Sequence, residues 1–208
     1  LEVALLGGDR LALGRRSPKG VSGYDLTALV VGSEGTLAVV DRITLKLLPR
    51  PITAVAALAA FPSLEVAGAS VVALSQAGQR PAALEIMDRV CIDHVRNATG
   101  YRYPDDAGAA LLLEVDGEPE LVEAELLRCA EVLQHAGATD VRLAQDEAQR
   151  RGLWQSRRLI TEKLKEGHRF KFGDDIAVPV GELPSMMAHI AQLAERHDLQ
   201  SAVFGHAG

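Results

Sequence analysis

Two basic side chains in the C-terminal half of the sequence have the chemistry to bind a carboxylate. Arg157 and Thr161 are four residues apart, so on a helix they share one face, where a guanidinium and a hydroxyl can hold a carboxylate together. Lys171 follows between Phe170 and Phe172, and alternation along a strand would place it on the opposite face from both. A solvated helix face and an edge-strand lysine that discourages aggregation explain the same residues equally well.

A second candidate is the glycine-containing segment that runs from Gly23 to Leu37. Gly32 and Gly35 bracket Ser33 and Glu34 between an expected short helix and a strand. Bare backbone N–H groups at such a turn can approach a phosphate or an aromatic ring. From the residues alone, a turn that only needs positive φ is the more common explanation of a short glycine motif.

A third candidate is His206, which follows Phe204 and Gly205 at the end of an apolar segment. A single histidine at the end of a strand is by itself most often structural. The segment from Glu85 to Asp88 is assigned to a turn and to the core. These candidates acquire specific roles only through the resemblance described below.

Composition excludes several classes of protein. With 208 residues, 48% hydrophobic and 24% charged, the chain is typical of a globular protein and not of a disordered or fibrous one. The apolar run that begins at Thr53 stops at Pro62, short of the roughly 18 to 20 residues that a membrane span needs. The net charge is −6 without a basic cluster, so nucleic acid is not an expected partner. Two cysteines are too few for a disulfide scaffold, and a reducing compartment is expected.

The elements that must position the candidates change in character at Pro49 and Pro51, because proline cannot donate to a sheet. Short strands and one short helix are expected before this point, the strands including 37–40 and 43–48. After it, strands alternate with longer helices, which predicts an α+β fold with helices over one face of a mainly antiparallel sheet. The expected strands are 53–61, 82–86, 109–115, 140–143, 170–178 and 201–204, and the longer helices are 63–77, 118–135, 146–165 and 183–197.

One family resemblance rests on the segment from Gly23 to Leu37, continued through Val39, Val40 and the ending Leu47-Leu48-Pro49-Arg50-Pro51. This stretch closely resembles the end of the FAD-binding domain in the flavoprotein family of D-lactate dehydrogenases, glycolate oxidases and D-2-hydroxyglutarate dehydrogenases. The resemblance implies that residues 1–52 are the C-terminal part of a PCMH-type FAD-binding domain. It implies that residues 53–208 are most of a ferredoxin-like substrate domain. The candidate FAD neighbours are Gly23, Tyr24, Ser33, Glu34, Gly35 and Val40.

The same resemblance assigns roles to the other candidates. It implies that Arg157 and Lys171 grip the substrate carboxylate with Thr161 beside them. It also implies that His206 is the first ligand of a divalent metal, for which zinc is one choice. The implied reaction oxidises a D-2-hydroxy acid, or glycolate, to the 2-oxo acid by hydride transfer to flavin. The catalytic base and the remaining metal ligands are expected beyond Gly208, so no catalytic residue is assigned within the chain.

The resemblance further implies an external electron acceptor, which could be a quinone, an electron-transfer protein or an iron–sulfur subunit. The expected location is the cytoplasm, or the membrane periphery. Leu1 lies inside an apolar segment and the last residues form no polar tail. We therefore expect the sequence to be a fragment that is inactive alone. The alternative is a non-catalytic α+β binding or assembly module whose Arg157 and Lys171 serve an acidic ligand or a partner protein.

Overall fold

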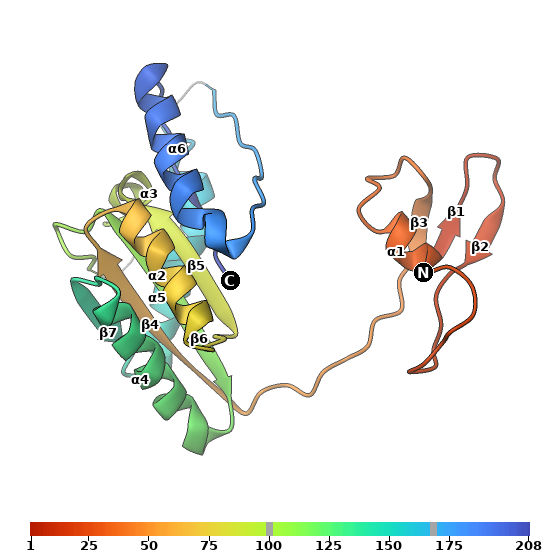
Figure 1. The fold of residues 1–208 in the computed structure, drawn as a ribbon, viewed down its shortest axis with the longest axis horizontal. Helices are drawn as coiled ribbons and strands as arrows, with labels where there is room; N and C mark the ends of the chain where they lie inside the picture. The colour runs from red at the N-terminus through yellow and green to blue at the C-terminus, as the bar shows by residue number, and fades with distance from the viewer. Residues whose placement is uncertain (99–101, 167–169) are drawn as a thin grey trace. The chain divides into compact units, whose positions relative to one another are not determined.

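A computed structural model describes residues 1–98, 102–166 and 170–208. The chain divides into two compact units, Leu1–Arg50 and Pro51–Gly208, and each is described by itself (Figure 1). None of the helices in the described ranges has both the length and the apolar composition needed to cross a bilayer.

The first unit is a small antiparallel sheet with one short helix. Strand β1 (Glu2–Ala4) lies between β2 (Arg10–Ala12) and β3 (Val39–Arg42), and α1 (Leu26–Val30) comes between β2 and β3 in the chain. Asp25 caps α1, since its side chain accepts a hydrogen bond from the backbone N–H of Ala28 at 3.1 Å. The strand expected at 43–48 is not formed, because no neighbouring strand pairs with the chain after Arg42.

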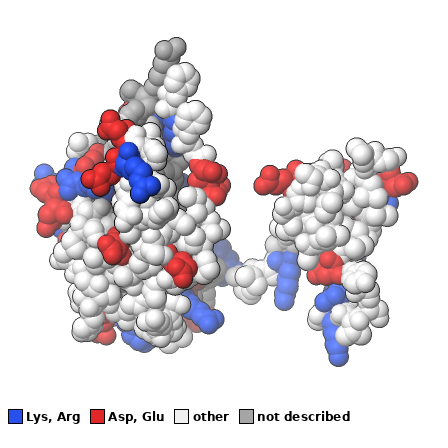
Figure 2. Space-filling view, turned by 45° about the horizontal axis from the view of Figure 1, so that its top comes forward, with Lys and Arg blue, Asp and Glu red and all other residues white. Residues whose placement is uncertain are grey.

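This unit has almost no interior of its own. Among the hydrophobic side chains of Leu1–Arg50, all of which the structure describes, only Val3 and Ala38 are buried. Its surface in Figure 2 is mostly uncharged. Exposed apolar side chains of this kind commonly mark an interaction surface.

The second unit is built on a five-stranded antiparallel sheet in the order β7-β4-β6-β5-β8. Its elements in chain order are β4 (Thr53–Phe61), α2 (Leu64–Gln76), β5 (Ala83–Asp88), α3 (Arg89–Val95), β6 (Ala109–Gly117), α4 (Pro119–His135), β7 (Asp140–Leu143), α5 (Glu147–Lys163), a 3₁₀ turn η1 (Val180–Glu182), α6 (Leu183–Arg196) and β8 (Phe204–His206). The sequence β4-α2-β5-β6-α4-β7 with the order 7-4-6-5 is the ferredoxin-like arrangement. Strand β8 extends the sheet at β5.

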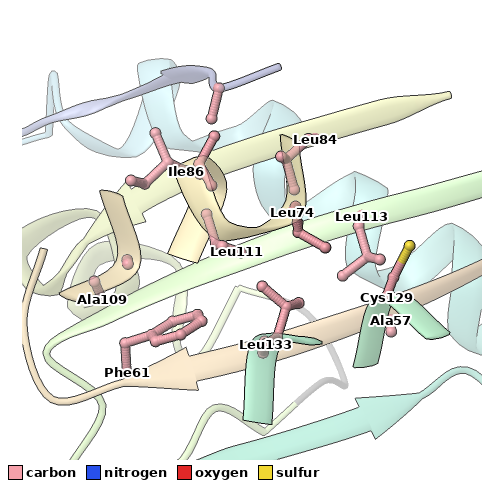
Figure 3. Close-up of a cluster of buried hydrophobic side chains, with 14 of the residues drawn as sticks. Ala57, Phe61, Leu74, Leu84, Ile86, Ala109, Leu111, Leu113, Cys129 and Leu133 are labelled. Atoms are coloured by element: carbon pink, nitrogen blue, oxygen red, sulfur yellow. The ribbon is translucent and has the colours of Figure 1, made fainter. Parts of the chain in front are cut away.

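Helices cover both faces of this sheet, which corrects the expectation of helices on one face. Strand β4 is apolar at every position from Val55 to Phe61, so both of its alternating sets of side chains are buried. One set, with Ala57, Ala59 and Phe61, packs with α2 and α4 in the first core, which Figure 3 shows. The other set, with Ala56, Leu58 and Ala60, packs with α3 and α5.

Two further features of this unit bear on the candidate site. The strand expected at 170–178 is not formed: residues 170–178 have no regular secondary structure, and Phe170, Phe172 and Ile176 are exposed. The final strand is Phe204–His206 instead of 201–204. Acidic and basic side chains are interspersed on the face of the unit that Figure 2 shows.

Candidate functional site

The candidate site is organised around Glu85, a buried carboxylate in β5. Alternation along β5 sends Leu84 and Ile86 into the first core and turns Glu85 toward the opposite face, which α5 covers. The Glu85 side chain is only 5% exposed. A buried carboxylate is costly unless cationic or hydrogen-bonding groups surround it.

Glu85 binds two other side chains, one on each carboxylate oxygen. Its Oε2 accepts a hydrogen bond from Nε of Arg157 at 2.7 Å and also lies 2.7 Å from Nη2 of the same guanidinium. Its Oε1 lies 2.5 Å from Nδ1 of His206. Arg157 reaches Glu85 from α5, and His206 faces it across the antiparallel pair of β5 and β8. Three separate elements therefore meet at this carboxylate.

The ring of Phe204 lies beside the same group. The guanidinium carbon of Arg157 is 4.9 Å from the ring centroid, and Nζ of Lys171 is 5.7 Å from it. Both distances fit cation–π contacts. Lys171 is exposed and lies in the irregular segment, so its place at the site does not come from the predicted strand alternation. The structure thus gathers Arg157, Lys171 and His206.

The charges of this cluster suit one carboxylate ligand. Glu85 offsets the charge of Arg157, and the ammonium of Lys171 leaves an excess of about one positive charge when His206 is neutral. The Nε and Nη2 positions of Arg157 face Glu85, while Nη1 has no hydrogen-bond partner in the described part of the chain. Nη1 and Lys171 can therefore bind an anion together.

Thr161 lies on α5 one turn after Arg157, as the four-residue spacing predicts. It is exposed to solvent. No hydrogen bond joins it to Arg157 or to Lys171 among residues 1–98, 102–166 and 170–208. The placement of Thr161 beside Arg157 therefore rests on the helical spacing alone.

A second carboxylate, Glu114 on β6, also binds an arginine of α5, and within the described ranges it makes no contact with a histidine. Glu114 Oε2 accepts hydrogen bonds from Arg150 Nη1 at 2.6 Å and from Trp154 Nε1 at 2.5 Å. Hydrogen bonds from Arg150 to Glu147 and then to Glu114 raise the pKa of the Arg150 guanidinium, although burial opposes them. This group anchors α5 to the sheet.

Nucleophilic catalysis by a cysteine finds no support near the site. Cys91 is fully buried at the start of α3. Burial and the adjacent Asp88 carboxylate raise the pKa of its thiol well above the usual range. The nucleophilic thiolate is therefore strongly disfavoured at neutral pH.

The candidate FAD neighbours lie in the first unit, around α1 and on β3. Gly23 and Tyr24 precede α1, and Ser33, Glu34 and Gly35 form the turn that follows it. Gly35 has φ of 80° and Glu34 has φ of 50°, so this turn uses the left-handed region that favours glycine. A Cβ atom added at Gly35 would meet nothing within 4 Å. The glycine backbone therefore faces open space.

Other groups of the first unit also suit a flat, partly apolar ligand. Tyr24 is 95% exposed, and Val40 on β3 is also exposed. Tyr24 and Thr27 help to line a hollow of about 490 Å³. The hydroxyl of Thr27 is buried there without a hydrogen-bond partner in the unit, which the structure describes in full. Open glycine backbone, exposed apolar side chains and an unpaired hydroxyl fit a bound cofactor such as FAD.

The predicted metal site at His206 is not supported by the described residues. His206 is the predicted first ligand, and Glu85 is the carboxylate beside it. Within the described ranges, no group of three or more His, Cys, Asp or Glu side chains is placed to hold a metal ion. His206 and Glu85 alone do not fit a metal centre.

Comparison with known proteins gives the family. The family model "FAD linked oxidases, C-terminal domain" matches residues 50–208. The chain belongs to this family of FAD-linked oxidases. Over its whole length it is 39% identical to glycolate oxidase subunit GlcD of Escherichia coli and 34% identical to GlcD of Bacillus subtilis. It is 30% identical to the mitochondrial D-2-hydroxyglutarate dehydrogenase of Bos taurus.

These FAD-linked oxidase relatives are much longer than the chain. It covers 42%, 44% and 39% of the three relatives, respectively. Among solved structures, alkyldihydroxyacetonephosphate synthase matches with a TM-score of 0.63 at 14% identity, covering 94% of this chain and 40% of that one. At this identity the match concerns the fold. It agrees with the predicted mixed fold of antiparallel sheets with helices.

Two residues of the candidate site are not predicted by the sequence. The sequence pattern places Glu85 with its neighbours in a turn and the core, and Phe204 only in a strand. An acidic residue between Leu84 and Ile86 in an apolar strand is a signal for a buried carboxylate, which needs a cation. The identity of that cation depends on the sheet order and the position of α5.

Proposed function

We propose that the full-length protein oxidises a D-2-hydroxy acid, or glycolate, to the 2-oxo acid with FAD as the electron acceptor. The observation that carries the proposal is the meeting of Arg157, Lys171 and His206 around Glu85 and Phe204. The names of the relatives, which include glycolate, D-lactate and D-2-hydroxyglutarate, support a 2-hydroxy acid as the substrate.

Arg157 and Lys171 bind the substrate carboxylate in this proposal, and Thr161 lies at the edge of that site. The planar guanidinium gives the carboxylate an orientation, and the ammonium adds a point charge. The ring of Phe204 holds both cations and removes water from one side of the site. Fixing the carboxylate fixes the neighbouring C2 atom, which is the positioning that the reaction requires.

Residues 1–52 form the C-terminal part of the FAD-binding domain in this proposal, and residues 53–208 form the substrate domain. Gly23, Tyr24, Ser33, Glu34, Gly35 and Val40 are the proposed FAD neighbours, supported by the open glycine backbone and exposed side chains described above. When bound, FAD accepts the hydride that leaves C2, while the hydroxyl proton goes to a base that we expect outside these residues.

The remaining parts of the proposal concern groups outside the chain. Electrons leave the flavin for a quinone, an electron-transfer protein or an iron–sulfur subunit. The protein works in the cytoplasm or at the membrane periphery. A divalent metal at His206 would need further ligands from residues that the structure does not describe, so no step is assigned to a metal.

The test uses the purified full-length protein. We expect a flavin absorption spectrum that bleaches under anaerobic conditions when D-lactate, glycolate or D-2-hydroxyglutarate is added. A colourless protein that remains inactive after FAD is added, or a flavin that none of these acids reduces, would show the proposal to be wrong.

A matched pair of arginine variants on α5 tests the carboxylate site. Arg157→Ala should lower kcat/KM for every carboxylate substrate by about 10- to 100-fold, because a hydrogen bond to a charged group contributes about 1.5 to 3 kcal/mol. Arg158→Ala, which changes an exposed neighbour on the same helix, should leave kcat/KM within about twofold of wild type. An unchanged kcat/KM in Arg157→Ala would remove Arg157 from the site.

A further inference from the structure

We propose that the ring of Phe204 holds the Lys171 ammonium at the carboxylate site, which makes Phe204 a positioning residue for the second cation. This inference rests on the carboxylate-binding part of the proposed function and extends it to a side chain that is itself uncharged. Lys171 then contributes to carboxylate binding only while an aromatic face lies beside its ammonium.

Lys171 is the less constrained of the two cations. It is exposed and lies in the segment 170–178, which has no regular secondary structure. Its Nζ atom lies 5.7 Å from the centroid of the Phe204 ring, and no ion pair or hydrogen bond of this ammonium is formed within the described ranges. The four-carbon stem of a lysine is flexible. The contact with the ring is therefore what keeps this charge at the site.

Arg157 is held by more than the ring. Its guanidinium carbon lies 4.9 Å from the same centroid, but Nε and Nη2 also lie 2.7 Å from Oε2 of Glu85. Removing the ring would leave Arg157 with this second contact and Lys171 with none in the described chain. The loss of the ring should therefore resemble the loss of Lys171 more than the loss of Arg157.

The ring itself has a fixed place in the fold. Phe204 pairs with Met87 in the register of β5 and β8, and it packs against the hydrophobic cluster on the α3 and α5 face of the sheet. The preceding residue, Val203, donates its backbone N–H to Oδ2 of Asp88 at 2.7 Å and accepts from the backbone N–H of Asp88 at 2.9 Å. The ring is thus a stable platform for a mobile cation.

An aromatic ring suits this task better than a second carboxylate would. The face of the ring carries partial negative charge and attracts both cations, although the cations repel each other. A carboxylate beside Lys171 would hold the ammonium more firmly but would also cancel its charge. The ring positions Lys171 and leaves its positive charge available to a ligand.

The experiment is a double-mutant cycle on the full-length, FAD-loaded protein. Its readout is the Kd of oxalate, measured by titration calorimetry, because this carboxylate binds without turnover. Phe204→Leu keeps the apolar packing and should raise Kd about fivefold, as expected for loss of a cation–π contact at an exposed site. Lys171→Met should raise Kd about tenfold or more. In the Lys171→Met background, Phe204→Leu should add less than about twofold.

A matched control is Phe172→Leu, which makes the same change next to Lys171 at a side chain that is 97% exposed. Its Kd should stay within about twofold of wild type. A fivefold rise in this control, or an equal effect of Phe204→Leu with and without Lys171, overturns the inference.

A second substitution separates the electrons of the ring from its shape. Pentafluorophenylalanine at position 204 keeps the ring and its apolar surface but lacks the negative face. It should raise the Kd of oxalate at least as much as Phe204→Leu does, about fivefold or more. A wild-type Kd with the fluorinated ring overturns the inference, and this arm decides the question if Phe204→Leu fails to fold.

These measurements separate the inference from the oxidation of a 2-hydroxy acid. If no 2-hydroxy acid reduces the wild-type flavin but oxalate binding shows the expected coupling, the proposed reaction is wrong and the role of Phe204 stands. If the acids reduce the flavin and the fluorinated ring leaves the Kd unchanged, the reaction stands and the role of Phe204 is wrong. A wild-type protein that does not bind oxalate overturns the inference directly.

Discussion

Replacing Arg157 with methionine tests the buried ion pair by its effect on stability. Methionine keeps most of the length and apolar contact of the side chain but leaves Glu85, only 5% exposed, with His206 as its sole side-chain partner in the described chain. Breaking a buried pair from one side costs about 3 to 5 kcal/mol. Because Arg157 is itself 17% exposed, we expect the lower end of that range, about 3 kcal/mol.

Replacing the other partner of the ion pair, with Glu85→Leu, should lower stability less than Arg157→Met does. Arg157 is longer and more exposed than Glu85, so its charge can turn toward water when the carboxylate is removed. The double variant carries no unpaired buried charge, and apolar pairs of this kind are often as stable as the ion pair that they replace. We therefore expect the double variant to lie within about 1 kcal/mol of wild type, with a coupling free energy of about 2 kcal/mol or more.

The assay is thermal unfolding at neutral pH, monitored by circular dichroism, of the wild type, Arg157→Met, Glu85→Leu and the double variant. A loss of 3 kcal/mol corresponds to a fall in Tm of about 6 to 12 °C for a protein of 150 to 250 residues. The double variant should recover most of this loss. If Arg157→Met and the double variant unfold at the same lowered temperature, the two side chains are not coupled and the account of Glu85 as a paired buried charge is wrong.

Two further predictions concern the substrate unit. Gly108→Ala should lower stability by about 3 kcal/mol, because the added Cβ would clash with the backbone carbonyl group of Pro62, whose carbon would lie 2.6 Å away. Gly68→Ala in α2 has no atom nearer than 3.5 Å to the added Cβ, so it should be neutral or stabilising by up to about 1 kcal/mol. Equal Tm values for the two variants would contradict this. Burial raises the pKa of the Cys91 thiol above its ordinary value of 9.0, so the folded state holds this proton more tightly than the unfolded state does. The stabilisation from this proton is complete below pH 9.0 and is lost as the pH rises further. Urea unfolding between pH 7 and 10.5 should show a smaller alkaline loss in Cys91→Ala than in wild type, and parallel curves would refute the assignment.

Local signals in the sequence predict much of the fold. Ser63 and Asp146 are residues of the types that cap helices, and their side chains accept hydrogen bonds from the backbone N–H groups three residues later. The helix that carries Arg157 therefore begins and ends near its expected bounds. Caps and periodicity are local, so they can be found without knowledge of the partner element.

The predictions that are wrong depend on distant partners. Alternation around Lys171 predicts a strand, but no neighbouring strand pairs with residues 170–178, and Phe172 is almost fully exposed. The continuous apolar run in β4 does not by itself show that helices lie on both faces of the sheet. The position of Lys171 near Phe204 and the pairing of Glu85 with Arg157 likewise arise from contacts between elements far apart in the chain.

The alternation within β5 places core side chains and charged-contact side chains on opposite faces of one short strand. Leu84 and Ile86 pack in the first core, while Glu85 on the other face contacts Arg157 and His206. Changes to Glu85 and its contacts therefore act on the α5 face of the sheet and leave Leu84 and Ile86 in the first core, although loss of one charged partner lowers stability. A one-residue insertion or deletion in β5 would exchange the two faces and harm both. Engineering of this face should thus substitute side chains and keep the length of β5 fixed.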